Sequence, residues 1–149
     1  IDEQKHTADE KKLTVNLICD PALPHIHGDK NLIRMVFQNL VSNAIKYTPA
    51  NGSVECEITA SGVMHKMIYI RVTDTGIGIP KEEWGRVFEK LHRASNAQML
   101  VPDGTGLGLY VVKTIIDHAG GKITFESELN KGTTFNVSLP IQWQATVKH

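Results

Sequence analysis

Hydrophobic and polar residues alternate along five stretches of the chain, and a period of two residues predicts β-strands. A turn signal at Ser61-Gly62 separates the second strand from the third, and Asn130-Lys131-Gly132 separates the last two, so both pairs are expected to be joined by short connections. The five predicted strands are residues 13–18, 54–59, 68–73, 122–127 and 133–139.

Helical spacing of apolar residues appears between these strands. Asp29 suits the N-cap of a helix that runs to about Tyr47, where Thr48-Pro49 ends it. A short helix is expected over 82–88, and a longer one over 106–119 ends at a glycine pair. At 149 residues these helices and strands are expected to form one α+β domain, which we place at residues 13–140.

The two ends of the chain are predicted to lie outside this domain. Residues 1–12 are almost entirely polar, so we expect a tail or the end of an upstream element. Residues 141–149 are expected to be a C-terminal tail. The first residue is isoleucine rather than methionine, which indicates a piece of a longer protein.

Two glycine-rich turns, residues 74–80 and 104–109, lie before and after a polar segment, residues 90–103, which we call the lid. Alternate glycines allow positive φ and close approach of a ligand to the backbone. A polar loop of this length is uncommon in a compact domain unless it is functional. The pattern predicts a lid that closes over an anionic ligand.

Several polar side chains are predicted to face inward. Asp74 continues the apolar phase of the third strand, and Thr133 shares the apolar phase of the fifth. A buried carboxylate needs hydrogen-bond donors. Asn39, Asn43 and Lys46 follow one another at i, i+4 and i+7, so they share one helix face beside the apolar stripe.

Composition limits the functional classes. The 149 residues are 41% hydrophobic and 21% charged, with 16 basic and 16 acidic side chains, so no overall field recruits nucleic acid or membrane. Cys19 and Cys56 are expected to be buried free thiols in a reducing compartment. No apolar run reaches the roughly 18 residues of a membrane span, and no signal peptide is visible, so a cytoplasmic location is expected. The seven histidines show neither metal-ligand spacing nor a convincing acidic partner.

Together these features predict a pocket for Mg²⁺ and ATP. An inward carboxylate can accept a hydrogen bond from adenine N6, and an inward hydroxyl can hold a water beside the ring. Asparagine oxygens suit Mg²⁺. Backbone N–H groups that open a helix at the second glycine turn suit phosphate.

The sequence resembles the catalytic ATP-binding domain of sensor histidine kinases, which belongs with gyrase and heat-shock chaperone ATPases to the Bergerat fold. The similarity covers residues 13–140. It is carried by motifs that match, in order, the N, G1, F and G2 boxes and a last motif of that family: Asn39-x-x-x-Asn43-Ala44-x-Lys46-Tyr47, Asp74-x-Gly76-x-Gly78, Val87-Phe88-Glu89, Gly104-x-Gly106-x-Gly108 and Gly132-Thr133-Thr134-Phe135.

The resemblance implies a two-layer α/β sandwich, with a mixed five-stranded sheet covered on one face by three helices. It implies that Asn43 binds Mg²⁺ with Asn39 nearby, that Lys46 and Arg93 contact phosphate, and that Asp74 binds adenine N6 with help from Thr133 through water. The remaining nucleotide contacts expected are Tyr47, Gly76, Gly78, Ile79, Gly104, Thr105, Gly106, Leu107 and Gly108. The aromatic pair common before the lid arginine is replaced by Leu91-His92, and a frequent histidine is replaced by Ala119.

The resemblance also implies the reaction: the γ-phosphate of ATP passes to a histidine on a separate dimerisation and phosphoacceptor domain, upstream in the same protein. No histidine here has the sequence context of that acceptor. A response regulator would be the indirect partner, and the isolated domain, which binds no nucleic acid, is expected to be a monomer. The parent protein could be membrane-anchored.

Other interpretations stay open at this stage. The chain could be a free-standing ATPase like gyrase or a chaperone, or a module that binds nucleotide only as a structural ligand. Asn39 and Asn43 could be ordinary surface residues, Asp74 could cap its own turn, and Lys46 and Arg93 could be solvated charges. Tyr47 could simply pack at the helix end. A Rossmann dehydrogenase is disfavoured because the second glycine turn follows a polar lid rather than a strand.

Overall fold

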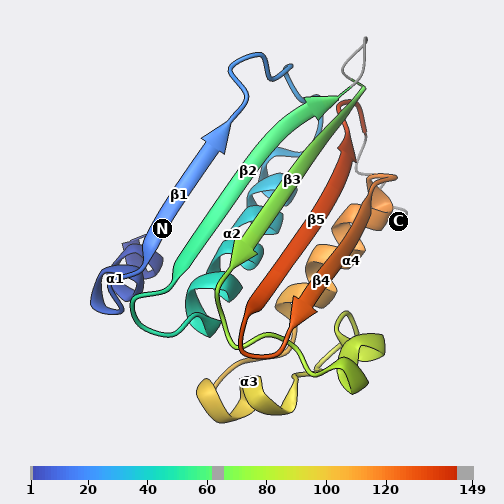
Figure 1. The fold of residues 1–149 in the computed structure, drawn as a ribbon. Coiled ribbons are helices and arrows are strands. Elements are labelled where there is room, and N and C mark those ends of the chain that lie inside the picture. Colours follow the sequence, from blue (N-terminus) through green and yellow to red (C-terminus); the bar gives the residue numbers. More distant parts are fainter. Residues whose placement is uncertain (1, 62–65, 144–149) are drawn as a thin grey trace.

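The computed structural model describes residues 2–61 and 66–143, and these form one mixed sheet with helices (Figure 1). The strand order is β1-β2-β3-β5-β4, with β1 and β2 parallel and every other neighbouring pair antiparallel. The strands are β1 (Thr14–Cys19), β2 (Ser53–Ser61), β3 (Met67–Asp74), β4 (Lys122–Glu128) and β5 (Gly132–Pro140). The helices are α1 (Asp2–Glu10), α2 (Lys30–Tyr47), α3 (Ser95–Leu100) and α4 (Gly108–His118), with a 3-10 helix η1 (Lys81–Arg86).

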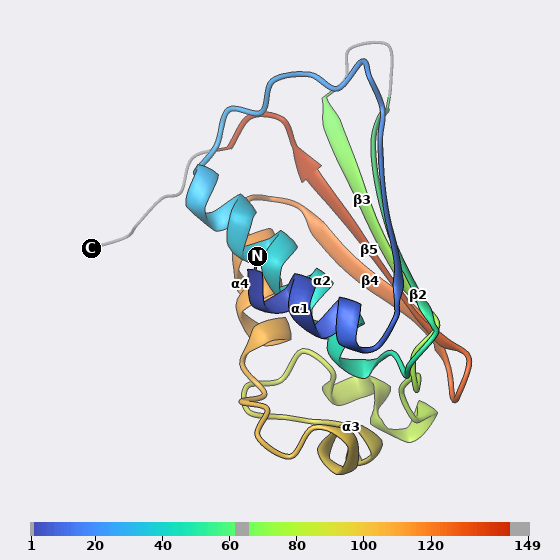
Figure 2. The same cartoon turned by 90° about the vertical axis from the view of Figure 1, so that its left-hand side faces the viewer.

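Helices α1, α2 and α4 lie on one face of the sheet, and the hydrophobic core fills the space between the two layers (Figure 2). This core includes Val36 and Leu40 of α2 and Ile70 and Val72 of β3, each at most 1% exposed. The opposite face carries the polar residues of each alternating strand. The predicted two-layer sandwich, with a mixed five-stranded sheet under three helices, is confirmed.

Some elements differ from the sequence-based expectation. Residues 2–10, expected to be a tail or the end of an upstream element, form helix α1, and Ala8 is buried in the core. Lys11 then donates to three carbonyls at the end of α2, those of Ile45, Lys46 and Thr48, at 2.9, 2.7 and 3.1 Å. Whether α1 continues an upstream element stays a prediction.

Two short helices lie on either side of the lid's start. The helix expected over 82–88 is the 3-10 helix η1, and none of its residues is buried. The lid contains α3, a six-residue helix with no buried residue. Both lie below the sheet at the end where β3 finishes (Figure 1).

The two cysteines differ in environment. Cys56 is buried, and burial raises the pKa of its thiol to about 11, with a further contribution from Cys19. Cys19 is exposed, so the prediction of two buried thiols was wrong for this residue. It lies on β1, an outermost strand whose six residues are all exposed.

The C-terminal end packs further than expected. Trp143 is 8% exposed and belongs to the core, and His27 pairs with Gln142 in an isolated bridge. The predicted tail therefore does not begin at residue 141, and residues 144–149 lie outside the described part, as does most of the predicted turn after Ser61. Across the described ranges, no helix is long and apolar enough to cross a membrane.

Candidate nucleotide-binding site

Three polar side chains form one row across the end of the sheet. Asp74 of β3 is in register with Thr133 of β5, which is in register with Ser127 of β4. Asp74 is 8% exposed and Thr133 is 7% exposed, so the inward orientation predicted from strand phase holds for both. Successive residues of a strand point to opposite faces of the sheet. Because Asp74, Thr133 and Ser127 are paired in register, their side chains all lie on the face that the helices cover.

The Asp74 carboxylate is satisfied by the backbone. Its Oδ1 accepts from the N–H of Gly76 at 2.8 Å and from the N–H of Thr133 at 3.2 Å. Burial raises the pKa of Asp74 to about 6, and these two hydrogen bonds act in the opposite direction. An ionised carboxylate accepts at both oxygens, so Oδ2 can accept from a ligand.

Helix α2 supplies the amide and ammonium groups. Asp29 caps the N-terminus of this helix, since its Oδ1 accepts from the N–H groups of Asn31 and Leu32, at 2.8 and 3.3 Å. Asn39 Nδ2 donates to Met35 O at 2.9 Å, which turns its oxygen outward toward α4. A Cβ atom on Gly108 would lie 2.8 Å from that oxygen, so Gly108 lets the backbone approach the amide closely.

The first glycine turn closes the end of the site where Asp74 lies. A Cβ atom on Gly76 would lie 2.6 Å from both Asp74 Oδ1 and Tyr47 O, so residue 76 has no room for a side chain. Gly78 has a φ of +68°, a conformation that glycine adopts without strain. Ile77 N donates to Tyr47 O at 3.1 Å, which ties this turn to the end of α2.

The second glycine turn opens helix α4. Gly106 has a φ of +68°, and its carbonyl accepts from Leu91 N at 2.9 Å. No side chain caps the start of α4 at Leu107, unlike the start of α2. Uncapped N–H groups at the start of an 11-residue helix form an anion site, since they carry the positive end of the helix dipole.

These elements surround one cavity with a volume of about 180 Å³. A cavity for a single water has a volume of roughly 10–15 Å³ on the same scale, so this cavity can hold a ligand of many atoms. Gly76 and Leu107 do not line it. All other residues expected to bind nucleotide line it: Asn39, Asn43, Lys46, Tyr47, Asp74, Gly78, Ile79, Arg93, Gly104, Thr105, Gly106, Gly108 and Thr133.

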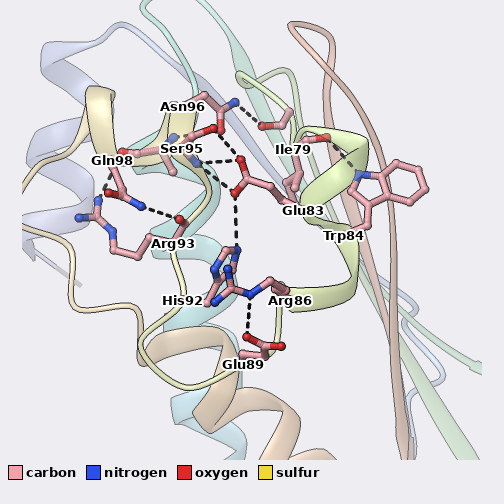
Figure 3. A network of polar contacts seen from close by, with 12 residues as sticks. Ile79, Glu83, Trp84, Arg86, Glu89, His92, Arg93, Ser95, Asn96 and Gln98 are labelled. Atoms are coloured by element: carbon pink, nitrogen blue, oxygen red, sulfur yellow. Dashed lines mark hydrogen bonds and ion pairs between the residues drawn. The ribbon is translucent and has the colours of Figure 1, made fainter.

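Hydrogen bonds from the lid to Glu83 connect the lid to η1 (Figure 3). The Glu83 carboxylate accepts from Ser95 N at 3.1 Å and from Ser95 Oγ at 2.6 Å, and these bonds lower the pKa of Glu83. His92 Nε2 lies 3.6 Å from Glu83 Oε2, and Asn96 Nδ2 donates to Gly78 O at 2.9 Å. The sequence did not indicate that the Glu83 carboxylate lies beside His92.

Arg93 lies in the lid with its guanidinium directed to backbone carbonyls. It donates to Pro102 O at 2.8 Å, to Ala97 O at 3.3 Å and to Val101 O. Sequence reasoning did not identify Glu83 or Ser127 as part of the site. Neither lies in a glycine motif, and their partners are 12 and 6 residues away.

Comparison with known families settles which group of proteins shares this arrangement. Residues 28–142 match the family described as histidine kinase-, DNA gyrase B-, and HSP90-like ATPase. The chain belongs to this family. The match spans α2, both glycine turns and β5, so it contains every candidate site residue.

Similar proteins identify the branch. The chain is 38% identical over 116 residues to the sensor histidine kinase WalK of Bacillus subtilis, covering 78% of this chain and 19% of that protein. It is 36% identical over 135 residues to the adaptive-response sensory kinase SasA of Synechocystis, covering 89% and 33%. The chain thus spans about a fifth to a third of the length of these relatives.

Solved structures agree with these relatives. A mycobacterial sensor histidine kinase, MprB, has a TM-score of 0.76 at 25% identity, covering 93% of this chain and 91% of that one. The nucleotide-free catalytic domain of histidine kinase ThkA has a TM-score of 0.75 at 25% identity, covering 97% and 87%. The chain is an ATP-binding catalytic domain of the histidine kinase type, as its motifs predict.

Proposed function

We propose that the cavity binds Mg-ATP, with adenine at Asp74 and the phosphates at the second glycine turn. The observation that carries this proposal is the polarity of the cavity. One end presents a buried carboxylate, an acceptor for an exocyclic amine. The rest of the lining includes Lys46, Arg93 and the uncapped start of α4, which suit a polyphosphate. A full-length relative in structure, ShkA, was solved in complex with AMPPNP.

The residues present fit a magnesium ion. No group of three or more His, Cys, Asp or Glu side chains that could hold a metal occurs in the described ranges, so a metal cage made of protein alone is not available there. Mg²⁺ keeps several waters and bridges phosphates, and it needs only one or two protein oxygens. Asn43 would hold it, with Asn39 beside it, and the ion would neutralise charge on the terminal phosphates.

We further propose that the γ-phosphate passes to a histidine on a separate dimerisation and phosphoacceptor domain of the same protein. The domain's own residues would orient the nucleotide, exclude water beneath the lid and hold the terminal phosphate toward the opening. The names and greater lengths of the relatives support this proposal, as does the neutral amide at Asn39, where an ATPase needs a base. A response regulator would then receive the phosphate from that histidine.

Labelling of a supplied acceptor domain tests the proposal. The chain is incubated with radiolabelled ATP, Mg²⁺ and a dimeric acceptor domain from a similar kinase. We expect acid-labile, alkali-stable label on the acceptor, lost with EDTA and with Asp74→Asn. Absence of label together with proven ATP binding would contradict the transfer, and absence of ATP binding would contradict the whole proposal.

A further inference from the structure

Ser127 does not line the cavity, but its hydroxyl contacts two parts of the adenine end, strand β5 and the first glycine turn. Its Oγ lies 2.9 Å from Thr133 Oγ1, accepts from Ile79 N at 2.8 Å and donates to Gly132 O at 3.1 Å. Ile79 belongs to the first glycine turn, and Thr133 lines the cavity. One hydroxyl therefore joins β4, β5 and the turn after β3.

All three contacts of Ser127 can be hydrogen bonds at once only if Thr133 donates its hydroxyl proton. Ser127 has one proton and two acceptor lone pairs. The Gly132 carbonyl can only accept, and the Ile79 N–H can only donate, so the first takes the Ser127 proton and the second takes one lone pair. The 2.9 Å contact is then a hydrogen bond only if Thr133 donates to Ser127.

The consequence appears inside the cavity. Thr133 uses its only proton on Ser127, so its oxygen presents lone pairs alone to a ligand. Asp74, when ionised, is also an acceptor only. The adenine end of the cavity is therefore a wall of two acceptors in adjacent strands, Asp74 and Thr133 being in register. Such a wall suits an amino group or a water that donates, and it opposes a carbonyl oxygen.

We propose that Ser127 is a specificity-determining positioning residue, which holds Thr133 as an acceptor and so selects 6-amino purines over 6-oxo purines. This inference rests on the proposed ATP site. Without Ser127, the Thr133 hydroxyl is free to rotate and donate to a 6-oxo group. The 6-oxo purine then gains a partner that it lacks in the native site, while the 6-amino purine loses an acceptor.

Paired dissociation constants for ATP and ITP test the inference. ITP carries a 6-oxo group without the 2-amino group of guanine, so the pair isolates position 6. We expect Ser127→Ala to lower the preference for ATP about tenfold, mainly because ITP binds more tightly. Ser127→Thr retains the hydroxyl and should retain the preference. Thr124→Ala, which removes an exposed hydroxyl of the same strand from the opposite face, is the matched control.

The outcomes separate the inference from the proposed function. If the native chain binds neither nucleotide, the ATP site itself is wrong and the inference fails with it. If the native chain prefers ATP and a folded Ser127→Ala keeps the same ratio, the inference alone is wrong. Equal changes in Thr124→Ala would also overturn it. If Ser127→Ala does not fold, Ser127→Cys replaces it, because cysteine keeps the side-chain shape and is a weaker acceptor. An unchanged preference for ATP over ITP in Ser127→Cys would also contradict the inference.

Discussion

Gly104 lies directly against the guanidinium of Arg93, and a Cβ atom on residue 104 would come within 2.7 Å of Arg93 Cζ. The first glycine of the second turn therefore makes room for the lid arginine. In this arrangement the two terminal nitrogens of Arg93 donate to the carbonyls at the end of α3, while its buried Nε has no partner among the described residues. The guanidinium is therefore held at the end of α3 and keeps donors that these carbonyls do not use.

We expect Gly104→Ala to loosen the lid with little effect on global stability. The guanidinium is the far end of a flexible chain, so it can be displaced, and Ala97 O, Val101 O and Pro102 O then lose Arg93 as a donor. Ala97 O and Val101 O keep only their backbone donors, Val101 N and Gly104 N. Hydrogen exchange of residues 97–104 should become several-fold faster while the melting temperature changes little. Gly85→Ala is the control, because a Cβ atom there would meet nothing within 4 Å. Equal exchange in both variants would contradict the role given to Gly104.

The lid should be cleaved without nucleotide and protected by a triphosphate. Helix α3 has no buried residue, and Met99 is 81% exposed, so local opening of this segment costs little. Thermolysin should cut near Met99 and Leu100, and a non-hydrolysable ATP analogue should slow that cut more than ADP does. Arg93→Gln should lose the difference between the two nucleotides. Unchanged cleavage at proven saturation would contradict lid closure.

Asp74→Asn should stabilise the nucleotide-free domain at alkaline pH. The pKa of this carboxyl is raised from 3.8 to about 6, so the folded state binds the proton more tightly than the unfolded state. The free energy of unfolding of the native chain therefore falls as pH rises from about 4 to 6, and the penalty is complete above 6. Asparagine can keep the bonds from Gly76 and Thr133 and has no such penalty.

Urea unfolding of the two proteins from pH 4 to pH 8 measures this difference. The variant should be more stable by on the order of 1–3 kcal/mol at pH 8, and the gap should close toward pH 4. Asp103→Asn, at an exposed lid position, should show no such trend. A difference that does not vary with pH would show that ionisation of Asp74 is not its cause.

Adenine selectivity should disappear in the same variant. ATP at 100 times its dissociation constant should stabilise the native chain by roughly 2.7 kcal/mol. The gain should be much smaller with GTP, since a guanine carbonyl would face the Asp74 acceptor. Asp74→Asn should lose most of the gain with ATP. Equal thermal shifts of the native chain by ATP and GTP would contradict the assigned base contact.

Hydrolysis of ATP by the domain alone should be very slow. Asn39 presents an amide whose Nδ2 donates to Met35 O, and an amide oxygen cannot take a proton from an attacking water. The gyrase and chaperone branch of the family is expected to carry a glutamate at this place. Steady-state phosphate release of about 1 per second or more would overturn the kinase assignment, provided that Asn43→Ala abolishes it.

Local periodicity in the sequence determined the elements and much of the site. A period of two places Asp74 and Thr133 on the inner face whichever strands they pair with, and helical spacing places Asn39 and Lys46 on one face of α2. Glycine at Gly76 and Gly106 marks turns because backbone conformation is also a local property. The fold and the family followed from these patterns together with the order of the motifs.

Only the tertiary structure decided which side chains satisfy one another across strands and loops. Ser127 joins Thr133 because β4 and β5 pair in one register, and Glu83 holds Ser95 because η1 folds back on the lid. Exposure of Cys19 depends on β1 being outermost, and burial of Trp143 depends on docking after β5. Such contacts are set by the packing of distant segments, which a pattern along the chain does not encode.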